Sequence, residues 1–179
     1  MTGMKSFART AGAGMLVLAL MGSQANGQAL RGHNTNAPVD VAADRIEVQD
    51  RADRAIFSGD VVARQGDMTL SAARLTVAYS DAGGIQIDRL TASGGVLLRS
   101  PSETARGEYA IYDLNNRVIT MLGGVTLTRG ESRVNGARLV LSLDTGRAVL
   151  DGGAGAAPGT TSSEDGRVTG TFTVPQRTD

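Results

Sequence analysis

A repeat of about 29 residues constrains this chain more than any other feature of its sequence. One pattern, a small residue followed by alternating apolar positions, occupies residues 43–48, 72–77, 107–112 and 136–141. A second pattern, a glycine followed two residues later by valine, begins at Gly59, Gly94 and Gly123 and, degraded, at Gly152. From each of the first three glycines to the next copy of the first pattern is 13 residues. Each unit therefore reads as two strands with two turns, and we expect an array of strand pairs.

The spacing is broken once, by six extra residues between Val77 and Leu90. The stretch 80–84, which contains Ser, Asp and two Gly, is the natural place for them and predicts a lengthened hairpin loop. Apolar residues at helical spacing are not sustained in the repeat region, so we expect almost no helix.

Aligned repeats place apolar residues in the same columns, with polar residues such as Asp60 and Thr126 between them. Because strand side chains alternate between two faces, one face of the sheet is predicted to be apolar throughout. The residues that we expect on this face are Val39, Val41, Ile46, Val48, Phe57, Val61, Met68, Leu70, Leu75, Val77, Leu90, Val96, Leu98, Tyr112, Ile119, Met121, Val125, Leu127, Leu139 and Leu141.

The phase of the apolar residues slips within the longer stretches. Met68 and Leu70 have even numbers, whereas Leu75 and Val77 have odd ones, and the last repeat does the same. A bulge or sharp bend near Ala72 and Gly136 would cause such a slip and fold the sheet over on itself. The predicted fold is therefore all-β, a twisted antiparallel β-jelly-roll or half-barrel.

The first 29 residues have the parts of a secretory signal peptide. Lys5 and Arg9 precede the twelve apolar or small residues 11–22, a run too short for an anchored transmembrane helix. We expect cleavage after Ala29, with Ala25 as the alternative site and an uncleaved anchor as the competing interpretation. Removing Lys5 and Arg9 from the 18 basic residues leaves 16 against 18 acidic ones, a formal charge of −2. This balance gives no electrostatic reason to expect nucleic acid as a partner.

The remaining segments follow from composition. Residues 30–37 are predicted to be a linker, 38–150 the β-domain, 151–165 a flexible loop rich in small residues, 166–175 a final strand around Phe172, and 176–179 a tail. The chain has no cysteine, so stability must come from burial and backbone pairing although an exported chain enters a compartment that permits disulfides.

Residues suited to catalysis are scarce. His33 is the sole histidine, and we expect it to be solvated in the linker. An early cluster of carboxylates could form a glycosidase pair or a calcium site, but its place at turns and on the polar face favours solvated charges. We therefore expect neither an enzyme nor a cofactor or metal. The carboxylates are Asp40, Asp44, Glu47, Asp50 and Asp53.

Four short motifs follow one another along the chain: PVDVAAD at 38–44, FSGDVVARQG at 57–66, AAR at 72–74 and VPQ at 174–176. In this order they resemble the periplasmic lipopolysaccharide-transport proteins of LptA/OstA type across most of the mature chain. Asp60 departs from the asparagine that the family often has there. Related domains occur in the membrane-anchored LptC and in the N-terminal part of the outer-membrane LptD, so the motifs do not select LptA alone.

The resemblance implies a periplasmic carrier that shields the acyl chains of lipid A and joins head to tail with like domains. It also implies an LptC-like inner-membrane anchor and an LptD-like outer-membrane protein as partners. The stretch from Val39 to Val48 and the strand around Phe172 are the expected joining edges, because terminal strands offer unpaired backbone groups.

A structural protein remains the alternative. The same apolar columns would line the closed core of a β-solenoid or an adhesin-type repeat that binds no lipid, and any single one of these residues is explained by burial alone. Met68 and Met121 fit either a packed core or an adaptable lipid contact. Tyr112 fits either a buried position or a groove mouth.

Overall fold

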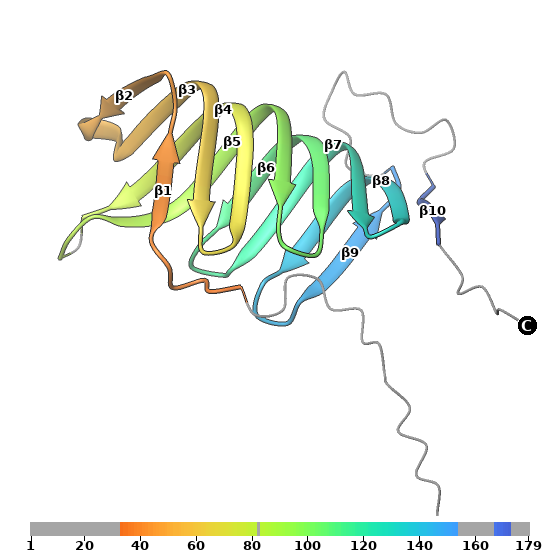
Figure 1. Ribbon diagram of the computed structural model, residues 1–179. Coiled ribbons are helices and arrows are strands. Elements are labelled where there is room, and N and C mark those ends of the chain that lie inside the picture. Colours follow the sequence, from red (N-terminus) through yellow and green to blue (C-terminus); the bar gives the residue numbers. More distant parts are fainter. Residues whose placement is uncertain (1–32, 82, 154–166, 173–179) are drawn as a thin grey trace, which may run out of the picture.

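The computed structural model describes residues 33–81, 83–153 and 167–172. All strands within these residues belong to one antiparallel sheet, shown in Figure 1. Six long strands form the body, and short strands pair at both ends. The order is β1-β3-β4-β5-β6-β7-β8-β10, with β2 also pairing with β3 and β9 also pairing with β8. The strands are β1 (Val39–Ala42), β2 (Arg45–Gln49), β3 (Arg54–Gln65), β4 (Met68–Ser80), β5 (Gln86–Arg99), β6 (Thr104–Asp113), β7 (Val118–Arg129), β8 (Ser132–Ser142), β9 (Arg147–Asp151) and β10 (Thr169–Thr171). The only helix among the described residues is one 3₁₀ turn (Asp50–Ala52), so the all-β prediction is confirmed.

A line of β-bulges folds the sheet over on itself. The register of neighbouring strands shifts at the glycine step of β3, β5 and β7, and the partner strands shift opposite it. In β5 the step consists of Gly94 and Gly95, with φ of +83° and +77°. Residues other than glycine rarely adopt this backbone conformation. Ala72 and Gly136 lie at the shifts of their own strands, so the predicted bend near these residues is confirmed. The bend leaves two halves of one sheet facing each other.

The first bend has an aspartate where the others have a second glycine. Gly59 has φ of +80° and Asp60 has φ of +40°. Aspartate and asparagine tolerate left-handed backbone better than other side chains because their short polar groups bond locally. The departure from asparagine at position 60 therefore preserves what the backbone requires.

The hairpin from β4 to β5 carries the extra residues of the second repeat. β4 ends at Ser80 and β5 starts at Gln86, and both strands are longer than those of the β6–β7 hairpin. In Figure 1 this yellow-green hairpin reaches beyond its neighbours. The six residues thus lengthen two strands as well as the predicted loop.

Several predicted segments lie partly or wholly outside the described residues. The signal peptide (1–29), most of the 151–165 loop and the 176–179 tail fall there, as do the ends of the proposed last strand. Within 166–175, the described residues include the short strand β10. No helix in the described part of the chain is long and apolar enough to cross a membrane.

Candidate functional site

The apolar face of the folded sheet is organised in rows that cross every long strand. Strand register places one residue from each of eight strands side by side, and nearly every one of them is apolar. The Met121 row is Ile46, Phe57, Leu75, Ala92, Ala110, Met121, Leu139 and Leu150. The Tyr112 row is Val48, Ala55, Val77, Leu90, Tyr112, Ile119, Leu141 and Ala148.

A third row faces these two from the other half of the sheet. It runs through strands β1 and β10 instead of β2 and β9, because the short end strands divide between the two halves. The Leu98 row is Val41, Ala63, Leu70, Leu98, Ala105, Leu127, Val134 and Gly170. An apolar interior therefore extends between the two halves from the first strands to the last.

The predicted face residues differ in exposure according to their place along this interior. Most of them form one buried core; Val39, Val41, Phe57 and Leu127 pack against its edge, and Ile46 and Val48 are each 56% exposed. The buried ones are Val61, Met68, Leu70, Leu75, Val77, Leu90, Val96, Leu98, Tyr112, Ile119, Met121, Val125, Leu139 and Leu141. The interior is thus filled by its own side chains in the middle and exposed to solvent at the β2 end.

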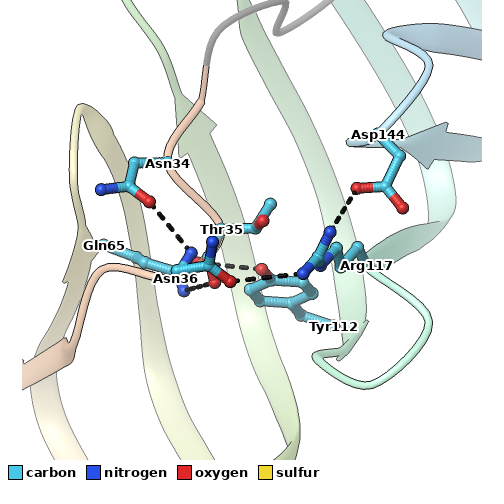
Figure 2. Close-up of polar contacts among 7 residues, drawn as sticks. All are labelled: Asn34, Thr35, Asn36, Gln65, Tyr112, Arg117 and Asp144. Carbon is cyan, nitrogen blue, oxygen red and sulfur yellow. Dashed lines mark hydrogen bonds and ion pairs between the residues drawn. The ribbon is translucent and has the colours of Figure 1, made fainter.

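At the edge opposite the bends, the two halves meet through buried polar side chains. The Tyr112 hydroxyl donates to Gln65 Oε1 at 2.9 Å, and Gln65 is only 3% exposed. Gln65 Nε2 in turn donates to the carbonyls of Thr35 and Ala37, each at 3.0 Å. Figure 2 shows Gln65, Tyr112 and the segment around Thr35 converging at this point. We call this edge, opposite the bends, the open edge. Residues 33–37 lie along it and form a segment that we call the strap.

The strap is fixed at its other side by a charged pair. Arg117 Nη2 donates to Asn36 Oδ1 at 3.2 Å, while Arg117 Nη1 lies 3.0 Å from Asp144 Oδ1 (Figure 2). These two residues lie in the β6–β7 and β8–β9 turns. Both side chains are exposed, so the ion pair adds little stability.

The strap corrects the expectation for His33. The sequence suggested a solvated linker residue, but His33 is half-buried and its Nε2 lies 3.2 Å from Gln65 Oε1. The contact spans 32 positions along the chain, which no local pattern reveals. A signal existed in Gln65, which continues the apolar phase of Val61 and Ala63 with a polar side chain.

Replacing Tyr112 with Phe tests the polar closure of the open edge. We expect the free energy of unfolding to fall by about 1 kcal/mol at neutral pH, because one buried hydrogen bond is lost. Burial raises the pKa of Tyr112 above its ordinary value of 10.0. The folded state therefore keeps the hydroxyl proton where the unfolded chain releases it, and this contribution is full below pH 10.0 and declines above it. Urea unfolding at neutral pH and at about pH 11 should give a smaller difference between wild type and Tyr112→Phe in alkali; an equal difference at both would contradict the assignment.

A buried carboxylate in the β5–β6 turn was also missed by the sequence analysis. Glu103 is 7% exposed and pairs with Arg129 at the end of β7. Its Oε2 is buried without a hydrogen-bond partner among the described residues. The pair brings together positions 26 apart, and neither residue stands out in the apolar pattern.

The early carboxylates have no such surroundings. Asp40, Asp44, Glu47, Asp50 and Asp53 are all exposed. In the described part of the chain, no group of three or more acidic, histidine or cysteine side chains is arranged to hold a metal ion.

Comparison with known proteins bears on this arrangement. The chain is 36% identical over 125 residues to an uncharacterized protein, R00383, of Rhizobium meliloti (strain 1021), which covers 66% of this chain and 67% of the relative. The fold of the present chain matches the crystal structure of LptH, the LptA-homologous periplasmic component of the lipopolysaccharide transport device of Pseudomonas aeruginosa. That match has a TM-score of 0.67 and 18% sequence identity, and it covers 78% of this chain and 98% of LptH.

The family match covers the strands that build the interior. Residues 40–147 match the family described as LptA/(LptD N-terminal domain) LPS transport protein. This range begins in β1 and ends at the first residue of β9, so it includes all six long strands. The chain therefore belongs to the LptA/LptD N-terminal domain family of lipopolysaccharide transport proteins.

Proposed function

We propose that this protein is a periplasmic carrier that shields the acyl chains of lipopolysaccharide in its folded sheet on the way from the inner to the outer membrane. The observation that supports this most is the continuity of the three apolar rows across the whole sheet. It acts by binding, with no catalytic step.

The energetics of the cargo explain why such an interior is needed. Exposing one acyl chain of about a dozen carbons to water costs on the order of 10 kcal/mol at about 0.8 kcal/mol per CH₂. Aliphatic side chains replace water around the acyl chain without forming directional bonds. The acyl chain can therefore slide along the rows instead of being held at one point. Weak, uniform contact suits transport better than a tight site.

Access to the interior follows from where it is packed. Leu75, Met121 and Leu139 are fully buried, so an acyl chain must enter at an end or by separation of the two halves. Ile46 and Val48 offer an exposed apolar start at the β2 end. Along the open edge, the strap and the Gln65–Tyr112 contact would have to yield for a chain to enter sideways.

The ends of the sheet are the proposed contacts with other domains. β1 and β2 pair only with β3, and β9 and β10 pair only with β8 among the described residues, so each has a free edge. Strand addition at these edges would join the rows of one copy to those of the next, or to an LptC-like anchor and an LptD-like acceptor. Head-to-tail joining would make one continuous apolar path.

Acidic substitution at the first edge tests this assembly. We expect Val41→Asp and the more exposed Val48→Asp to reduce self-association at least tenfold, because each places a charge in an apolar row at the joint. Analytical ultracentrifugation over a concentration series measures the change. Thr126→Asp, on the outer face of central β7, is the matched control. If both edge variants associate as strongly as wild type, the N-terminal edge is not the joining surface.

Binding of the cargo separates the carrier from a closed β-solenoid. The purified chain from residue 30 onward is loaded with a fluorescent fatty acid, and lipopolysaccharide is compared with its fully deacylated form as competitor. The proposal predicts displacement by the intact lipid only. No fatty acid bound would favour a structural protein whose rows are closed core. Equal displacement by the deacylated form would contradict recognition of lipopolysaccharide through its acyl chains.

A further inference from the structure

A cavity of about 470 Å³ lies at the C-terminal end of the interior, beside the turns that join β7 to β8 and β8 to β9. Leu127, Val134 and Ala148 contribute to its walls, and Phe172 adds an aromatic side chain that is 68% exposed. Leu127 and Val134 belong to the Leu98 row, and Ala148 belongs to the Tyr112 row. The cavity is therefore the place where the facing halves separate and the interior opens.

Two arginines line the same cavity. Arg129 stands at the end of β7, and Arg147 at the start of β9. Arg129 is paired with Glu103, whereas Arg147 has no ion pair with any residue in 33–81, 83–153 or 167–172. With Glu103 counted, the group carries one net positive charge.

Glu103 fixes the position of Arg129. Its side chain is 4% exposed, and it lines a small neighbouring void together with Leu98 and Leu141. Leu127 lines both spaces, so the ion pair stands between the cavity and the packed interior. A buried carboxylate needs a cation beside it, so Arg129 is held at the cavity wall and does not swing freely in solvent.

We propose that this cavity binds the phosphate end of an amphiphile, with Arg147 and Arg129 donating to the phosphate and the hydrocarbon lying on Leu127, Val134 and Phe172. Guanidinium groups form strong paired hydrogen bonds with phosphate oxygens, and the net charge favours an anion. The volume is within the range of roughly 300–1,000 Å³ usual for small-molecule sites. The inference rests on the proposed carrier function and adds a site that recognises the head of the lipid as it enters or leaves.

Two probes with the same dodecyl chain separate recognition of the phosphate head from apolar contact with the hydrocarbon. Dodecyl phosphate and the uncharged dodecyl maltoside are titrated into the chain from residue 30 onward by calorimetry, below their micelle concentrations. Arg147→Gln should weaken dodecyl phosphate about tenfold and leave dodecyl maltoside within about twofold, because one charge-assisted contact is lost. Arg147→Lys should recover part of the loss.

Arg133→Gln is the matched control, because Arg133 is an exposed arginine of β8 that does not line the cavity. It should change neither probe. Dodecyl phosphate binding that is equally strong in Arg147→Gln and wild type would overturn the proposal. So would an equal loss for both probes, since it would mean that Arg147 contributes only packing.

Competition then identifies the source of the phosphate. Displacement of dodecyl phosphate by bisphosphorylated lipid A but not by phosphatidylglycerol supports a site for the cargo head, and displacement by both supports a general phospholipid site. Displacement by neither contradicts the proposal. This test can fail independently of the carrier function. If lipopolysaccharide contacts the interior but Arg147→Gln binds dodecyl phosphate as well as wild type does, only the phosphate site is refuted. If phosphate binding depends on Arg147 but lipopolysaccharide does not contact the interior, only the carrier function is refuted.

Discussion

Gly94→Ala is expected to lower the free energy of unfolding by about 3 kcal/mol. Gly94 has φ of +83°, which an alanine adopts only at a cost. A Cβ there would also lie 2.8 Å from the Cβ of Ala73 on the neighbouring strand, too close for a real contact. Both penalties fall on the bend that folds the sheet over.

Gly95→Ala is the matched control for this effect. Gly95 has φ of +77°, but a Cβ at this position would meet nothing within 4 Å. It should therefore cost only the backbone term, about 1–2 kcal/mol. Urea unfolding monitored by circular dichroism measures both variants. Equal losses would mean that the contact with Ala73 relaxes freely and that the bend is not tightly packed.

Leu139→Ala is expected to cost about 3 kcal/mol, because it removes a fully buried side chain from the middle of the Met121 row. Its neighbour Val140 points to the outer face and is half-buried, so Val140→Ala should cost less than about 1 kcal/mol. Thermal and urea unfolding of the two variants gives the comparison. Similar losses would contradict the assignment of an inner and an outer face to β8.

The faces and bends of the sheet could be predicted from sequence because they depend on the alternation of apolar and polar residues along each strand. The odd and even phases of Leu70 and Leu75 reported a bulge, and the bulge is present between Ser71 and Arg74. The repeat also predicted which residues share a column. Register then joins two predicted columns, those of Phe57 and Leu75, into one row, which required knowing how the hairpins pair.

The ends and the open edge could not be predicted in the same way. Ile46 and Leu75 have the same place in the repeat, yet one is 56% exposed and the other fully buried, because only one has sheet on both sides. The strap on Gln65 and the Glu103–Arg129 pair join residues distant in sequence. Such contacts depend on where the turns meet after folding, and local periodicity carries no record of that.

Photo-crosslinking from two adjacent positions of β7 tests the carrier proposal most directly. Val125 is fully buried on the inner face, and Thr126 is on the outer face of the same strand. A photoreactive residue at Val125, in a chain exposed to lipopolysaccharide, should form an adduct through the acyl chains, and one at Thr126 should form none. Adducts at neither position, or equal adducts at both, would contradict an interior that admits the lipid.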